Sequence, residues 1–121
     1  MSNADIACAV FKAFEAGDRA ALERLLATGF RFVSPYDNGI DRESYFALCW
    51  PAHEMIARFD LRRVVAQDDT VVVTYDGTFH DGRRNRNTEI FTVRDGLVQV
   101  IEVYFGWTLP HPVAPGQHQS P

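Results

Sequence analysis

The first fifty residues place apolar side chains at the three- and four-residue spacing that is typical of amphipathic helices. In the opening segment these positions are Ile6, Val10, Ala13 and Phe14. The spacing predicts a first helix that begins at Ser2 or Asn3 and ends at Gly17. Asp18 and Asp41 can each accept backbone hydrogen bonds at the start of a helix, so two further helices are expected after them.

Beyond residue 57 the pattern changes to the two-residue alternation of β-strands. Strands are predicted for four segments rich in Val, Thr, Phe and Tyr, at residues 58–67, 69–80, 83–94 and 97–107, and for a short earlier segment at 30–35. Asp81-Gly82 and Asp95-Gly96 are strong signals for two-residue hairpin turns. The order of elements predicts an α+β fold, with helices first and then an antiparallel meander.

Composition favours one compact domain. The chain has 121 residues, of which 46% are hydrophobic, and this content excludes general disorder. Residues 1–108 are expected to form the domain, and residues 109–121, which are rich in proline, a flexible tail. Cys8 and Cys49 lack the spacing of a zinc or redox pair, so free thiols are expected.

Charge and hydropathy limit the expected partners and the expected cellular location of the protein. The net charge of −4 offers no general attraction for nucleic acid. The longest apolar runs are far shorter than the ~20 residues that cross a membrane, and no secretory leader pattern follows Met1. We expect a cytoplasmic protein with no membrane or nucleic-acid partner.

The hairpin turns set the expected register of the last three strands. A two-residue turn at Asp95-Gly96 places Glu89 opposite Glu102 and Asn87 opposite Tyr104. The polar end of this face is expected to contain Thr74, Asp76, Asn87, Glu89, Glu102 and Tyr104. The helices would cover the apolar end of the face and leave the polar end as the floor of a pocket.

The opposite face of the predicted sheet carries a large apolar patch. Its last strand would present Ile101, Val103, Phe105 and Trp107. Such a patch is unusual on the surface of a monomer, so a homodimer through this outer face is expected.

Two carboxylates directly opposite each other repel when both are ionised. For Glu89 and Glu102 three outcomes are open: one of them shares or keeps a proton, a basic group lies between them, or a bulge turns Glu102 outward. In the first case one carboxyl has a raised pKa and can act as an acid or base near neutral pH.

Three stretches of the chain carry a resemblance to a known family. They are GDRAALERLLA, GFRFVSPYDNGIDRESYF and NTEIFTVRDGLVQVIEVYFGW. Together they resemble the nuclear transport factor 2-like superfamily, specifically its SnoaL-like and ketosteroid isomerase-like branch. The resemblance implies a strongly curved antiparallel sheet wrapped around the N-terminal helices as a cone with a deep apolar pocket, an architecture also described as an α+β barrel. It also implies homodimers through the outer face of the sheet and, in the enzymes, cofactor-free acid–base chemistry on apolar small molecules.

Two family motifs differ in this sequence. Ketosteroid isomerase uses an Asp directly before a proline as its base, and the resemblance aligns Ser34 with that position. Asp37, three residues later, could replace it only if the loop turns inward. The acid that SnoaL-type cyclases carry late in the last strand aligns with Gly106. The resemblance therefore implies a class of chemistry and no particular reaction.

Candidate site residues follow from the register and from the resemblance. The predicted catalytic residues are Glu89, Glu102, Asp37 and His53, and the predicted ligand-binding residues are Phe32, Tyr36, Tyr45, Trp50, Asn87, Phe91 and Tyr104. Glu89 would be the acid or base, with Asp37 or His53 as a second group at the entrance. No metal-ligand spacing occurs, and no cofactor is expected.

Two interpretations of function stay open. The first is a cofactor-free isomerase, cyclase, dehydratase or hydrolase that acts on an apolar substrate. The second is a non-catalytic ligand-binding and dimerisation module of the same fold, in which Glu89 and Asn87 only satisfy each other. A third class is a subunit that pairs with another protein through the face at Ile101–Trp107.

Overall fold

The computed structural model describes all 121 residues as three α-helices, one 3-10 helix and six strands. In chain order these are α1 (Asn3–Ala16), α2 (Arg19–Leu25), β1 (Leu26–Ser34), β2 (Asp37–Asp41), α3 (Arg42–Leu48), the 3-10 helix η1 (Trp50–Met55), β3 (Ile56–Gln67), β4 (Thr70–Phe79), β5 (Arg84–Arg94) and β6 (Leu97–Leu109). The predicted α+β fold is confirmed.

The helices begin at the predicted caps. The Ser2 hydroxyl accepts a hydrogen bond from the Asp5 N–H at 3.1 Å, and the Asp5 carboxylate accepts one from the Ser2 N–H at 3.0 Å. This reciprocal pair satisfies two backbone donors that the first turn of the helix leaves unpaired. Gly17 ends α1 in the left-handed conformation, with φ of 65°, and Asp18 and Asp41 cap α2 and α3.

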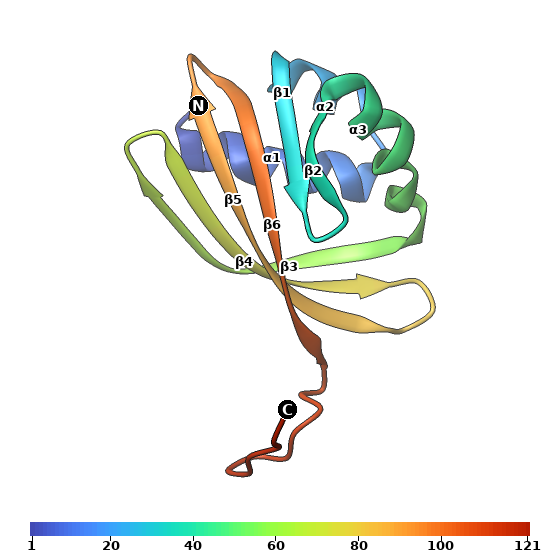
Figure 1. The fold of residues 1–121 in the computed structure, drawn as a ribbon. Helices are drawn as coiled ribbons and strands as arrows, with labels where there is room; N and C mark the ends of the chain where they lie inside the picture. The colour runs from blue at the N-terminus through green and yellow to red at the C-terminus, as the bar shows by residue number, and fades with distance from the viewer.

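The six strands form one sheet in the order β2-β1-β6-β5-β4-β3, with β1 and β6 parallel and the other neighbours antiparallel. Figure 1 shows the sheet as a curved layer that does not close, with α1 crossing behind β5, β6 and β1. The sequence pattern predicts no strand at β2. The first strand, expected at residues 30–35, begins earlier, at Leu26.

The core lies between the helices and the concave face of the sheet. Phe11 of α1 contacts the rings of Phe59, Tyr75 and Phe91, with centroids 5.1, 4.8 and 5.7 Å away. Edge-to-face pairs of this kind add about 0.5–1.5 kcal/mol each to the gain from burial. They fix α1 against three neighbouring elements of the sheet.

A bulge in β6 shifts the predicted pairing of the last hairpin. Asp95 and Gly96 both have positive φ, 55° and 75°, as the predicted two-residue turn requires. Val93 pairs with Val98, but Thr92 pairs with Val100, so Gln99 has no partner. The extra residue moves the pairs from Thr92 to Asn87 by one position.

The preceding hairpin has a three-residue loop instead of the predicted two-residue turn. The Phe79 N–H donates to the Arg83 carbonyl at 2.9 Å, which leaves residues 80–82 in the loop. Asp76 consequently lies opposite Arg86, and Tyr75 lies opposite Asn87. The expected place of Asp76 on the pocket floor is wrong.

Together these two shifts exchange the faces of several side chains. Ile101, Val103 and Phe105 share the inner face with Glu89, whereas Glu102, Tyr104 and Trp107 share the outer face. The predicted outer patch is therefore wrong for Ile101, Val103 and Phe105. Of that patch only Trp107 remains outside.

The chain after β6 forms no helix or strand and extends away from the domain (Figure 1). The His111 ring lies 5.1 Å from the ring of Trp107. None of the helices combines the length and the apolar character needed to cross a bilayer.

Candidate functional site

A cavity of about 330 Å³ opens between α1, α3 and the inner face of the sheet. This volume is near the lower end of the range for small-molecule sites, about 300–1,000 Å³. Most of its lining is apolar, including Val10, Phe11, Phe14, Phe32, Phe59 and Val103. Its polar groups are few, so each one has a strong influence on what can bind.

Glu89 of β5 is the acid in the inner wall of the cavity. Its carboxyl points inward because Glu89 pairs with Val73, a fully buried residue of β4. Burial raises the pKa of Glu89 to about 7, and a hydrogen bond with the Tyr75 hydroxyl offsets part of this rise. Near neutral pH the carboxyl is therefore divided between its acidic and basic forms.

Two tyrosines lie close to Glu89. Burial raises the pKa of Tyr45 and of Tyr75 well above their ordinary value, and the negative charge of Glu89 adds to both shifts. Both phenols therefore keep their protons and can serve as hydrogen-bond donors. Tyr45 comes from α3, opposite the sheet, and Tyr75 comes from β4.

Asn87 connects Tyr75 to the neighbouring strand. Its Nδ2 donates to the Tyr75 hydroxyl oxygen at 3.3 Å, and its Oδ1 accepts from the Gly106 N–H at 3.3 Å. A Cβ at position 106 would clash with the Arg86 carbonyl oxygen. The close approach of β6 to β5 at this point therefore needs glycine.

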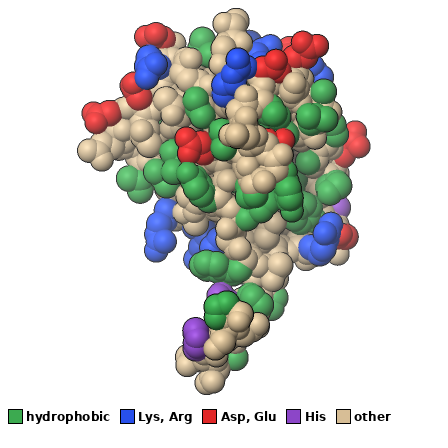
Figure 2. All heavy atoms as spheres, viewed as in Figure 1, with side chains coloured by type: hydrophobic (Ala, Val, Ile, Leu, Met, Phe, Trp, Pro, Cys, Tyr) green, Lys and Arg blue, Asp and Glu red, His purple; other side chains and the backbone are tan.

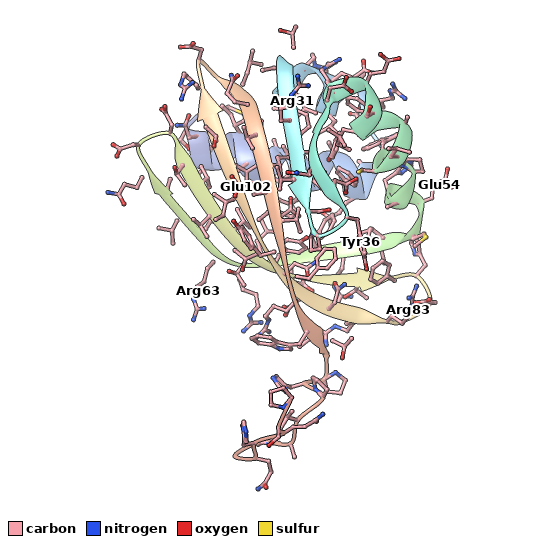
Figure 3. All side chains as sticks on the ribbon, viewed as in Figure 1. Arg31, Tyr36, Glu54, Arg63, Arg83 and Glu102 are labelled. Atoms are coloured by element: carbon pink, nitrogen blue, oxygen red, sulfur yellow. The ribbon has the colours of Figure 1, made fainter.

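Asp37 lies at the mouth of the cavity. Its loop therefore turns inward, which is the condition for Asp37 to reach the cavity. The Ser34 hydroxyl donates to Asp37 Oδ2 at 2.7 Å and accepts from the Tyr36 N–H at 3.0 Å. Tyr36, labelled in Figure 3, lies at the tip of the β1–β2 hairpin, 5.6 Å from the ring of Phe105. These residues form a rim around the entrance.

Cys49 also lines the cavity, although sequence reasoning did not select it. Burial, assisted by the negative charge of Asp37, raises the pKa of its thiol to about 11. The thiol therefore stays protonated near neutral pH and is a poor nucleophile. No group of three or more His, Cys, Asp or Glu side chains is arranged to hold a metal ion.

Glu102 and Tyr104 lie outside the cavity. Figure 3 shows Glu102 on the face of the sheet that points away from α1. The Tyr104 hydroxyl donates to Glu102 Oε2 at 2.9 Å on this outer face. Of the three outcomes left open for Glu89 and Glu102, the structure shows the third: the bulge at Gln99 turns Glu102 outward, and Val103 lies opposite Glu89. The register that paired the two glutamates, and the catalytic role predicted for Glu102 in the cavity, are therefore wrong.

His53, Trp50 and Phe91 also do not line the cavity. The 3-10 helix η1 brings His53 onto the Trp50 ring, with centroids 4.3 Å apart, and Trp50 itself is buried in the core. Phe91 is fully buried beneath α1. The predicted residues that do line the cavity are Phe32, Tyr36, Asp37, Tyr45, Asn87 and Glu89.

Sequence reasoning missed Tyr75, although the chain contains a signal for it. Along β4 the alternating set Val71, Val73 and Tyr75 is more apolar than the set Val72, Thr74 and Asp76. The more apolar set is expected to face the core. The two-residue turn predicted at residues 81–82 instead placed the set with Thr74 and Asp76 on the inner face. The three-residue loop of the structure places the set with Tyr75 there.

Asp76 is buried on the outer face under arginine side chains. Arg86 donates to both Asp76 oxygens, at 2.7 and 3.1 Å, and Arg62 donates at 3.4 Å. Hydrogen bonding from Arg86 holds the pKa of Asp76 below its ordinary value. This carboxyl is therefore an ionised structural partner and takes no part in the cavity.

Solved structures of other proteins share this fold. A Kribbella flavida DSM 17836 protein provisionally named a ketosteroid isomerase is 17% identical, with a TM-score of 0.76, covering 98% of this chain and 90% of that chain. A Jannaschia sp. CCS1 protein provisionally named a SnoaL-like polyketide cyclase is 19% identical, with a TM-score of 0.72 and coverages of 84% and 83%. A nuclear transport factor 2-like protein of unknown function from Burkholderia xenovorans LB400 is 24% identical, with a TM-score of 0.75 and coverages of 94% and 88%. At these identities the likeness establishes the fold.

Sequence comparison identifies the family. No curated protein matches the chain significantly. The model of the SnoaL-like domain matches residues 8–101, most of the chain. The resemblance noted in the sequence is thereby confirmed, and the chain belongs to the SnoaL-like domain family.

Proposed function

We propose that this protein is an enzyme that moves a proton on an apolar small molecule, with Glu89 as the acid–base group. The observation that carries the proposal is a carboxyl in an apolar cavity whose pKa burial raises to about 7. A group of this kind takes a proton and returns it at the same pH. No cofactor is needed for that step.

The cavity favours substrates with one polar group on an apolar body. A suitable substrate has a carbonyl beside a weakly acidic C–H bond. The Glu89 carboxylate takes the proton from carbon, the C–H electron pair moves toward the carbonyl, and negative charge develops on its oxygen. The Tyr45 phenol, which keeps its proton, is the donor proposed to stabilise that oxygen. Protonated Glu89 then returns the proton to another atom, as an isomerase or cyclase requires.

The names of two structurally similar proteins support this class of reaction. Two similar structures belong to proteins provisionally named a ketosteroid isomerase and a polyketide cyclase. One name refers to an isomerase of ketosteroids and the other to a cyclase of polyketides. For this chain we therefore propose a proton transfer of the isomerase or cyclase kind.

The test compares Glu89→Gln with Glu102→Gln, the same change on the outer face of the neighbouring strand. Apolar enolisable ketones are selected by binding, and exchange of their α-hydrogens in D₂O is followed by NMR. Glu89→Gln should lower the exchange rate about 10²- to 10⁴-fold and leave ketone binding and folding intact, since only the proton-transfer group is removed. Glu102→Gln should exchange at the wild-type rate. Equal rates in the two variants would contradict the proposal.

A specific observation favours the non-catalytic alternative. Because Glu102 faces outward, the inner wall has Glu89 as its single carboxyl, without a second acid beside it. A ligand-binding module needs no more than this. If the wild-type protein binds the ketones but exchanges no hydrogens above the buffer rate, the binding module is the better description.

We also propose that the protein forms a homodimer through the outer face of its sheet. The outer face retains exposed apolar side chains at Val65, Tyr104 and Trp107, which are 59%, 53% and 45% exposed. Figure 2 shows hydrophobic side chains gathered in patches on this face. The composition of the proposed interface thus differs from the one predicted from the sequence, but its place on the sheet is the same.

A further inference from the structure

We propose that Asn87 is a positioning residue that turns the Tyr75 hydroxyl proton toward Glu89, so that Tyr75 donates a hydrogen bond and Glu89 accepts it. The inference rests on the proposed role of Glu89. It goes further by naming what orients the carboxyl. The chain of contacts runs from Gly106 through Asn87 and Tyr75 to Glu89, across the three strands β6, β5 and β4.

The first step is the bulge at Gly106. Arg86 pairs with Trp107 and Asn87 pairs with Phe105, so Gly106 has no partner on β5. The absence of a Cβ lets its backbone approach the Arg86 carbonyl, where any larger residue would clash. This approach brings the Gly106 N–H to 3.3 Å from Asn87 Oδ1.

The second step is the orientation of the Asn87 amide. A side-chain amide has an oxygen that accepts and a nitrogen that donates. The Gly106 N–H can only donate, so it must face the oxygen of Asn87. The nitrogen then faces the Tyr75 hydroxyl oxygen at 3.3 Å. A backbone group therefore determines which end of Asn87 meets Tyr75.

The third step is the direction of the Tyr75 proton. Tyr75 lies opposite Asn87, and Glu89 is the next residue of β5 on the same face, which makes it the diagonal neighbour of Tyr75. Because the Tyr75 oxygen accepts from Asn87, its own proton is free to point at Glu89, whose pKa the Tyr75 hydroxyl lowers. In the proposed arrangement this proton holds one Glu89 oxygen and leaves the other to meet the substrate.

No basic side chain competes for Glu89 inside the cavity. The titratable groups that face it or share its cavity are Tyr75 from β4, Tyr45 and Cys49 from α3 and its C-terminal cap, and Asp37 from β2. The walls from α1 and β6 consist of Val10, Phe11, Phe14, Val103 and Phe105. The polar groups available to orient the carboxyl are therefore uncharged donors, and Tyr75 is the one that neighbours Glu89 diagonally on the sheet.

The test measures the pKa of Glu89 by NMR of its side-chain carboxyl carbon, without substrate, in Asn87→Ala, Tyr75→Phe and the double variant. Loss of the Tyr75 donor should raise the pKa by about one unit, because a hydrogen bond to a charged group stabilises the carboxylate. Asn87→Ala should raise it by about half as much. If Asn87 acts only through Tyr75, the double variant should match Tyr75→Phe alone.

The matched control is Asn85→Ala, the same change two residues earlier on the same face of β5 and outside the cavity lining. It should leave the pKa of Glu89 unchanged. If the alanine variant folds poorly, the measurement is repeated with Asn87→Ser. The serine side chain is too short to bridge the Gly106 N–H and the Tyr75 hydroxyl. The proposal is overturned if substitution of Asn87 leaves the pKa unchanged, or if it shifts the pKa equally with and without the Tyr75 hydroxyl.

The same titration separates this inference from the proposed function. A wild-type Glu89 that titrates near its ordinary value would remove the proposed catalytic role. Agreement between the double variant and Tyr75→Phe would still support the positioning role of Asn87 in that case. The two claims therefore fail on different observations.

Discussion

Glu89 and Glu102 are the same residue type on neighbouring strands, yet their surroundings give them different chemistry. Glu89 faces an apolar cavity that raises its pKa to about 7. Glu102 faces outward and accepts a hydrogen bond from Tyr104. The difference arises from one unpaired residue, Gln99, between them along the chain. At the scale of single residues, strand register decides which carboxyl can act as an acid or base.

Part of the site can be predicted from the sequence alone. Alternation along β5 predicted that Asn87 and Glu89 share the cavity face, and both line the cavity. Glu102 and Tyr104 could not be placed correctly, because a bulge depends on contacts between strands and has only weak local signals. Gln99, for example, donates to the Arg94 and Leu97 carbonyls at 3.2 and 3.4 Å, contacts that follow from the folded hairpin.

Among the elements, β6 does most to shape the site. Its bulge at Gln99 sets which side chains face the cavity, and its second bulge at Gly106 holds the Asn87 amide. Local signals predicted the helices and the four long strands because caps, glycines and alternation act over a few residues. The strand β2 was missed because Asp37–Asp41 is rich in turn residues and becomes a strand only by pairing with β1.

At this scale we predict that Gly106→Ala destabilises the fold. The added methyl group would clash with the Arg86 backbone, and overpacking of this kind costs about 1–3 kcal/mol. Gly29→Ala in β1 is the matched control, because a Cβ there meets nothing within 4 Å. Urea denaturation should show a lower free energy of unfolding for Gly106→Ala and little change for Gly29→Ala. Equal stability of the two variants would contradict the role assigned to this bulge.

The two sides of the whole molecule differ in character. The concave side of the sheet, with the helices, encloses the cavity, and the outer side combines exposed apolar residues with a cluster of arginines around Asp76. Arg63, labelled in Figure 3, extends from the lower part of this outer side. Such a surface suits a second copy of the chain better than open solvent.

We therefore expect sedimentation to give about twice the chain mass of 13.7 kDa. Tyr104→Glu places a charge among the exposed apolar side chains of the outer face and should shift the protein to monomer. Met55→Glu, an exposed apolar residue of η1 away from that face, should remain a dimer. A monomeric wild-type protein, or a Tyr104→Glu variant that stays dimeric, would refute the proposed interface.

The central claim is that burial in the cavity makes Glu89 an acid–base group near neutral pH. It is tested most directly by NMR titration of the Glu89 carboxyl carbon in the wild-type protein, with Glu89→Gln used to assign the signal. Because burial disfavours the charged form, ionisation is delayed as the pH rises, and we predict a midpoint near pH 7. A midpoint at the ordinary value of a glutamate, near pH 4.5, would contradict the account.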